Sequence, residues 1–371
     1  MSKTGTGAAS RLVRPMRPDD SEAVATLFTR VFRPGAPAPH PDLAPYLDRL
    51  CFTAPGYSAE TGSMVYDHPC TGLRSALLSI PFRYCLDGDT ITARLLCSFM
   101  ADGREGQVGA ARLSRYFRAA NHDLLIADSA SAVSADHWVT GGGVVLSVQS
   151  LAWQRVFRPA RAAALQLRRS LPRLGGMVAL APLALADRPF RHLRPTLAVE
   201  AALGLEVASV GADAFRAPAM AMLARFRLHP SWTELEFGWL ARLASENERH
   251  GRLQFRLIRD TGGATVGGFV FYGATGRRAE VLNVLCHPGA ENDTITAMLA
   301  ALDAEGYAMA VGMAQPFLMN ALQRHRWLTL KHRGFCCIAS RHETAMQAIR
   351  EDSFYVGGLA SESWSRLHAD F

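Results

Sequence analysis

The stretch of this sequence best suited to chemistry is a glycine-bearing turn between a predicted strand and a predicted helix. The strand, Ile91 to Met100, is rich in apolar and β-branched residues, and the turn is Arg104-Glu-Gly-Gln-Val-Gly-Ala110. Glycine lets a backbone approach a ligand closely, and a helix N-terminus offers unpaired N–H groups and a positive dipole end. Such a turn suits a phosphate or pyrophosphate, although many strand-to-helix turns contain glycine for conformational reasons alone.

Two titratable side chains that follow the turn are candidates for a general base. Asp128 ends the next predicted strand, and His137 lies on the short helix after it. Either could accept a proton from a nucleophile, directly or through water. Asp128 with Ser129 could equally form a turn or a helix cap, and a lone histidine on a short helix is often structural.

Other chemistries find little support. Lys3 and Lys331 are the only lysines, so a lysine nucleophile is not expected. The seven cysteines are scattered and have no zinc-like spacing, which favours reduced thiols in a cytoplasmic protein without a metal site. A Gly-x-Ser-x-Gly elbow is also missing from the sequence.

The order strand, turn, helix, strand, helix resembles the GNAT acyltransferase superfamily, whose acyl-CoA loop has the pattern Gln/Arg-x-x-Gly-x-Gly/Ala. Arg104, Gln107 and Gly109, followed by Ala110, match this pattern, with Gln107 in place of its first glycine. The opening strand and apolar-periodic helix resemble the first elements of the family. The resemblance covers roughly residues 11–157.

The resemblance implies a position for an acyl-CoA co-substrate. In the family, a break between two central strands holds the thioester, and backbone N–H groups provide most of the binding. The residues that match by position are Phe99, Met100, Val108, Gly109 and Ala110. Arg104 would add charge near the pyrophosphate. Trp138 stands where the family often has a tyrosine that protonates the leaving thiolate, and an indole cannot supply that proton.

The second half of the chain repeats the order of elements, so we predict an α+β protein with two GNAT-like units in tandem. The expected divisions are a disordered lead (1–10), the first unit (11–157), a linker (158–194) and a degenerate second unit (195–371). Cys286 to Asp293 stands where the second CoA loop would be, and its acidic Glu291 and Asp293 would repel a pyrophosphate. We therefore expect no ordinary CoA binding there. The C-terminal segment, Glu351 to Leu367, is expected to fold back across a unit or the groove between units.

The predicted linker is strongly basic. It holds eight arginines and one acid, Asp187, a surplus equal to the formal charge of +7 of the whole chain. One hypothesis is contact with an anionic membrane surface or with RNA through arginine and apolar anchoring. The alternative is a connector whose apolar part packs between the two units.

Three functions follow from these observations. The first is an acyl-CoA-dependent N-acyltransferase that acts on the amine of a small molecule or biosynthetic intermediate. The second is a catalytically idle acyl-CoA sensor or scaffold, which the departures at Gln107 and Trp138 favour. The third is a tandem transferase that takes its acyl group from charged tRNA, which only the basic linker favours. The expected location is cytoplasmic, with a membrane-peripheral location as the alternative.

Overall fold

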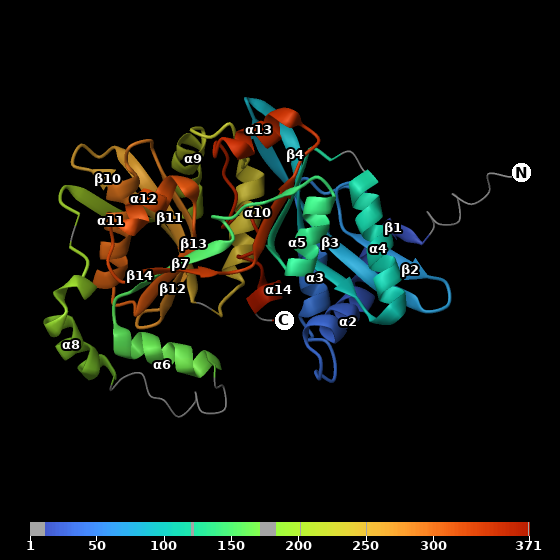
Figure 1. Cartoon of the computed structure of the whole chain (residues 1–371), viewed down its shortest axis with the longest axis horizontal. Helices are drawn as coiled ribbons and strands as arrows, with labels where there is room; N and C mark the ends of the chain where they lie inside the picture. The colour runs from blue at the N-terminus through green and yellow to red at the C-terminus, as the bar shows by residue number, and fades with distance from the viewer. Residues whose placement is uncertain (1–11, 120–121, 171–182, 201, 250, 370) are drawn as a thin grey trace, which may run out of the picture.

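Two mixed β-sheets organise the chain, one in each lobe of the molecule (Figure 1). The computed structural model describes residues 12–119, 122–170, 183–200, 202–249, 251–369 and 371. The predicted lead, residues 1–10, and residues 171–182 of the predicted linker lie outside this part of the chain. The α+β class predicted from the sequence is confirmed.

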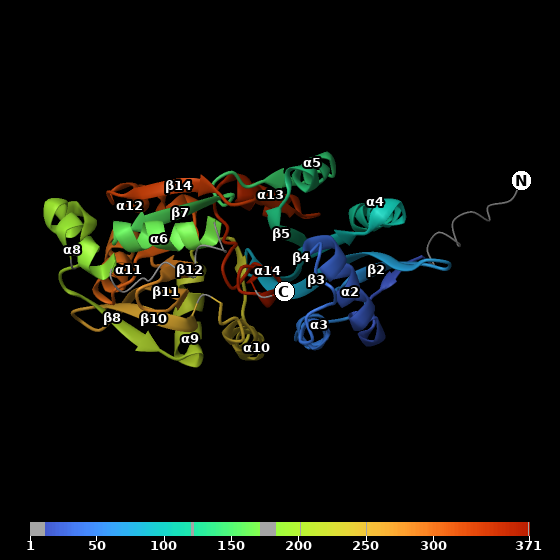
Figure 2. The same ribbon diagram turned by 90° about the horizontal axis from the view of Figure 1, so that it is seen from below.

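The first sheet has the strand order β1-β2-β3-β4-β5-β15-β6, and β9 pairs with β3. Helices α4 and α5 cover one face of this sheet, and α2 and α3 cover the other (Figure 2). The bounds are β1 (Val13–Pro15), η1 (Pro18–Asp20), α2 (Ser21–Phe32), α3 (Leu43–Phe52), β2 (Met64–His68), β3 (Gly72–Leu86), β4 (Asp89–Ala101), α4 (Gly103–Ala119), β5 (Leu124–Ala130), α5 (Ala132–Thr140), β6 (Val144–Val145), β9 (Leu228–Pro230) and β15 (Phe335–Ala339).

The second sheet has the order β14-β7-β13-β12-β11-β10-β8. Its strands are β7 (Leu151–Val156), β8 (Leu205–Val210), β10 (Arg252–Asp260), β11 (Thr265–Gly273), β12 (Arg278–Cys286), β13 (Met309–Met313) and β14 (Leu328–His332). The remaining helices are α6 (Pro159–Ser170), α8 (Leu183–Leu193), η2 (Pro195–Leu197), α9 (Ala212–Leu223), α10 (Glu234–Ser245), α11 (Glu291–Ala304), η3 (Pro316–Leu318), α12 (Met319–Gln323), α13 (Glu343–Arg350) and α14 (Arg366–Ala369).

The two sheets exchange strands, which corrects the boundary predicted at residue 157. β7 precedes that boundary but pairs with β13 and β14 in the second sheet, where Figure 1 shows it in green beside orange strands. β15 comes from the second half of the chain and pairs with β5 in the first sheet. β14 and β15, which only two residues separate, therefore belong to different sheets. The chain leaves one sheet for the other at Gly334, whose φ of +139° is far easier for glycine than for other residues.

The lobes also share one hydrophobic core. Buried side chains of the first unit, such as Tyr46 and Leu95, belong to the same apolar cluster as Trp239 and Trp364 of the second. The indole Nε1 of Trp239 donates a hydrogen bond to Thr53 Oγ1 at 2.9 Å. The arrangement of the two units is therefore fixed by apolar packing and by hydrogen bonds between them.

The predicted phosphate-binding turn, Arg104 to Ala110, is helical, because α4 already begins at Gly103. Its glycines allow the helix to lie close to the sheet. A Cβ atom at Gly109 would be 2.5 Å from the ring of Tyr66, and one at Gly106 would be 2.7 Å from the Arg74 carbonyl oxygen. Gly106 and Gly109 therefore serve the close packing of α4 on the sheet.

A pair of glycine-to-alanine substitutions tests this role. Gly109→Ala should lower the free energy of unfolding by about 1–3 kcal/mol, because the added methyl group forces α4 away from the sheet. Gly238→Ala is the matched control, since Gly238 lies within α10 and nothing lies near its missing Cβ. It should raise the free energy by roughly 0.5–1 kcal/mol through helix propensity. Urea unfolding followed by circular dichroism measures both, and equal stability of the two variants would contradict the packing role.

Candidate active site

Strands β4 and β5 separate part of the way along their length. Their parallel register in the described structure consists of Ala93↔Leu124, Arg94↔Leu125 and Leu95↔Ile126. Beyond these pairs, β4 runs on to Ala101 and β5 to Ala130. A β-bulge at Ser98, with φ of +48°, bends β4 within the separated part. Two strand edges with backbone N–H and C=O groups therefore face a gap in the sheet.

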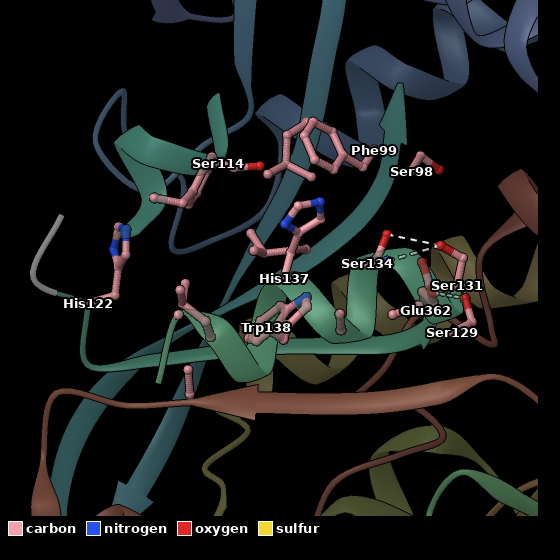
Figure 3. Close-up of a pocket in the computed structure, with 18 of the residues that line it drawn as sticks. Ser98, Phe99, Ser114, His122, Ser129, Ser131, Ser134, His137, Trp138 and Glu362 are labelled. Carbon is pink, nitrogen blue, oxygen red and sulfur yellow. Dashed lines mark hydrogen bonds between the residues drawn. The ribbon is translucent and has the colours of Figure 1, made fainter. Parts of the chain in front are cut away.

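A cavity of about 700 Å³ lies over this gap. It runs between α4 and α5 and extends to α2 and to the C-terminal segment (Figure 3). Its apolar lining includes Phe28, Phe32, Leu96, Phe99, Phe117 and Leu125. The cavity is wide enough for a molecule of cofactor size and has a large hydrophobic share.

One end of the cavity is polar. Ser129, Ser131, Ser134 and Glu362 gather there in Figure 3. The Ser129 hydroxyl donates a short hydrogen bond to Glu362 Oε1. Ser131 caps α5, because its hydroxyl oxygen accepts from the backbone N–H of Ser134 at 3.3 Å.

Asp128, the first candidate base, does not face the cavity. Side chains alternate along β5, so Ala127 and Ser129 line the cavity while Asp128 points to the opposite side. There it pairs with Arg333, with 2.5 Å between Nη1 and Oδ1, and accepts a hydrogen bond from Ser363 Oγ at 2.9 Å. Asp128 also does not form the turn or helix cap that was its alternative role. The role is an ion pair between β5 and the segment that links β14 to β15.

The groups around Asp128 favour its ionised form. Burial alone would raise the pKa of this carboxyl, but the Arg333 guanidinium and the hydroxyls of Ser361 and Ser363 together hold its pKa below the usual value. A carboxylate stabilised in this way is a poor proton acceptor near neutral pH.

His137 and Trp138 both line the cavity from α5, as Figure 3 shows. His137 therefore stays a candidate proton acceptor. A second histidine, His122, lines the other end of the cavity. Burial and the nearby Arg94 charge lower the pKa of His122 to about 4, so its ring is neutral near pH 7. Arg94 lies over the Phe117 ring, with 4.6 Å from Cζ to the ring centroid.

The residues predicted to hold the acyl-CoA separate into three groups. Phe99 lies at the cavity wall beyond the point where the strands part, while the Met100 side chain is buried in the core. Arg104 and Gln107 are exposed in the first turns of α4. The assignment of N–H groups from Val108, Gly109 and Ala110 was wrong, because they lie inside α4, where helical hydrogen bonds engage such groups. The N–H groups of Gly103, Arg104 and Glu105 open the helix instead.

Comparison with known proteins supports this geometry at the level of the fold. No family model matches the sequence, and no curated protein does either. Solved structures do match. A conserved protein of unknown function from Enterococcus faecalis, described as a probable N-acyltransferase, has a TM-score of 0.57 at 9% identity, over 92% of this chain and 74% of its own.

Two GCN5-related N-acetyltransferases (GNATs) match similarly. The one from Anabaena variabilis has a TM-score of 0.56 at 9% identity, over 91% of this chain and 74% of its own. The one from Kribbella flavida has a TM-score of 0.50 at 12% identity, over 88% and 70%. This chain has the GNAT fold. The match spans both units, so the resemblance stated from the sequence is confirmed for the architecture.

The second GNAT-like unit has a strand separation like the first, but the protein's own C-terminal segment occupies it. β12 pairs in parallel with β13 from Arg278 to Val281 and then continues to Cys286. The Asn283 side chain beyond this point donates to the Gly357 carbonyl at 3.2 Å and accepts from the Leu359 N–H at 2.9 Å. Gln315 Nε2 donates to the Val356 carbonyl at 2.7 Å. The predicted fold-back of the C-terminal segment is confirmed.

The basic linker uses several of its arginines within the protein. Arg158 and Arg191 both pair with Asp303, and Arg161 pairs with Asp187. In α8, Phe190 and Leu193 are exposed beside Arg194. None of the described helices is long and apolar enough to cross a membrane. Contact with a membrane surface or with RNA remains a prediction.

Glu362 and the serine cluster were missed by the sequence analysis. Nothing in the local pattern of Ser361-Glu-Ser-Trp-Ser365 marks it as part of a site, because chain topology alone brings it to the cavity. The signals that could have found it are the alternation along β5, which sends Ser129 to the face opposite Asp128, and the expected fold-back of the C-terminal segment. Within the part of the chain that the structure describes, no group of His, Cys, Asp or Glu side chains could hold a metal ion.

Replacing the buried carboxylate tests the role of Asp128. Asp128→Asn should lower the free energy of unfolding by about 3 kcal/mol at neutral pH, because Arg333 loses its counter-ion. The pKa of Asp128 is lowered in the folded state, so the stabilisation is present above about pH 4 and is lost in stronger acid. The difference between wild type and variant should therefore shrink below that pH. Asp136→Asn, at an exposed position on α5, is the control. A loss no larger than that of the control would contradict the structural role.

Proposed function

We propose that this protein is an N-acyltransferase that moves an acyl group from a CoA thioester to the amine of a small molecule. The observation that carries the proposal is the separation of β4 from β5 beneath a cavity of about 700 Å³ in a GNAT fold. The reaction needs a place for the thioester, a group that polarises its carbonyl and a route for the proton that leaves the amine. The cavity offers residues for the first and third needs.

The donor fits the separated strands. The backbone edges of β4 beyond Leu95 and of β5 beyond Ile126 can donate to and accept from an extended amide-bearing chain, as added strands do. An acyl group would meet the apolar wall that includes Leu96, Phe99 and Phe117. Arg104, exposed at the start of α4, could still contact the phosphate groups.

The acceptor fits the polar end of the cavity. Hydroxyl groups of Ser129, Ser131 and Ser134 can orient a polar amine, and His137 lies on the same helix as Ser134. The mixture of apolar wall and polar end suits an acyl donor and a polar acceptor that meet between them.

The idle-sensor hypothesis predicts that acyl-CoA binds without turnover, whereas this proposal predicts both binding and turnover. Its support is Trp138, which lines the cavity where the family often has a tyrosine. The tRNA-dependent hypothesis is weakened, because three of the linker arginines on which it rests are held in ion pairs.

Donor binding can be tested by thermal unfolding with CoA, acetyl-CoA and decanoyl-CoA. A ligand at about 100 times its dissociation constant adds roughly 2.7 kcal/mol, enough to raise the melting temperature by a few degrees. Ser114→Trp should abolish the shift, because Ser114 lines the cavity from α4. Arg115→Trp, at the next and exposed position, should keep it. A shift that survives Ser114→Trp would place the donor elsewhere.

Turnover is measured as release of free thiol from acetyl-CoA or decanoyl-CoA, with glycinamide, lysine and glucosamine as acceptors. The proposal predicts amine-dependent thiol release in at least one combination. Donor binding without any release would favour the sensor. The absence of both donor binding and thiol release would overturn the proposed function.

A further inference from the structure

Glu362 stands out among the charged side chains at the cavity, because it comes from the far end of the chain. Its side chain lines the cavity of the first unit, yet residue 362 follows the second unit in the sequence. The residue is only 4% exposed. The Ser129 hydroxyl donates to Oε1 and fixes the orientation of the carboxylate.

The segment that carries Glu362 is anchored on both sides. Before it, the backbone of residues 356–359 is bound by Asn283 and Gln315 in the strand separation of the second unit. After it, Ser363 binds Asp128 and Arg333, at 2.9 and 3.1 Å. These contacts leave the backbone at Glu362 little freedom, which is what a precisely placed reactive group requires.

Further anchoring comes from the first unit. The Tyr46 hydroxyl lies 3.1 Å from Ser365 Oγ and accepts a hydrogen bond from the Arg366 N–H at 3.0 Å. Leu367 then lines the cavity itself. The residues around Glu362 thus belong to three separate parts of the fold, and the carboxylate sits where those parts meet.

From this geometry we infer that Glu362, delivered by the C-terminal segment, is the general base of the acyl transfer, with Ser129 as its positioning residue. The inference rests on the proposed function. The amine nitrogen attacks the thioester carbonyl carbon, the C–N bond forms and the C–S bond breaks. One proton passes from nitrogen to the Glu362 carboxylate, directly or through one water, and then to solvent. The CoA thiolate leaves and takes a proton from solvent.

The inference changes the part played by the second unit. Its own strand separation is occupied by residues 356–359, so that separation serves as the support for the segment that completes the first site. Asp128 lies on the other side of β5 and supports Glu362 in two ways. It binds Ser363, the residue after Glu362, and it directly precedes Ser129, which binds the Glu362 carboxylate. An acid that the sequence suggested as the base thus becomes a residue that positions the base.

The experiment compares full-length wild type with Glu362→Gln and Glu362→Ala. It uses the thioester donor and the amine acceptor (glycinamide, lysine or glucosamine) that give the fastest turnover. Glu362→Gln should lower kcat by about 100-fold or more, the usual contribution of a general base. The acetyl-CoA thermal shift should stay unchanged. The acid limb of the wild-type pH–rate profile should be missing in Glu362→Gln, and added formate should partly restore the rate of Glu362→Ala. Glu343→Gln, at an exposed position on α13, is the matched control and should behave as wild type.

The outcomes separate the inference from the function on which it rests. Wild-type turnover with an unchanged rate and pH profile in Glu362→Gln would overturn the role of Glu362 and leave the proposed function intact. A slow variant that keeps the acid limb and gains nothing from formate would also overturn it, because that pattern indicates a structural role. Absence of wild-type turnover with every donor and amine would overturn the proposed function, and this inference with it.

Discussion

The buried ion pair between Asp128 and Arg333 holds the molecule together at the point where its two sheets exchange strands. Asp128 is fully buried on β5, and Arg333 lies in the two-residue link between β14 of the second sheet and β15 of the first. The fold brings these residues together across 205 positions of sequence. A charge in this environment is costly without its partner, so the pairing favours the arrangement in which β15 lies beside β5. The cavity depends on that arrangement, because β5 forms one of its walls.

The strand separations of the two units have different surroundings. Both have a pair of parallel strands that separate, as a GNAT fold requires, but only one separation opens onto the cavity described here. In the other, side-chain amides of Asn283 and Gln315 bind the backbone of the C-terminal segment. Amide side chains suit this task because they can donate and accept at once. The second unit thereby serves as a rigid support for residues that reach the first.

The elements were predictable wherever periodicity was strong. β4 lies close to where the run of apolar and β-branched residues from Ile91 to Met100 placed it. The strand exchange was not predictable, because only Arg333 and Gly334 separate β14 from β15, and nothing in their sequence shows which sheet each strand joins. The glycines of α4 were read as ligand contacts, yet a packing glycine and a phosphate-binding glycine look alike in sequence. Asp128 was misjudged because its partner, Arg333, is remote along the chain. Glu362 was missed for the same reason.

The central claim is that an acyl-CoA donor binds between the separated strands of the first unit and not in the second. Hydrogen–deuterium exchange with saturating acetyl-CoA tests it most directly, because it reports on backbone amides at both separations at once. We expect slower exchange over residues 96–105 and 127–138, with no change over residues 282–293. Slower exchange confined to residues 282–293 would contradict it and place the donor in the second unit.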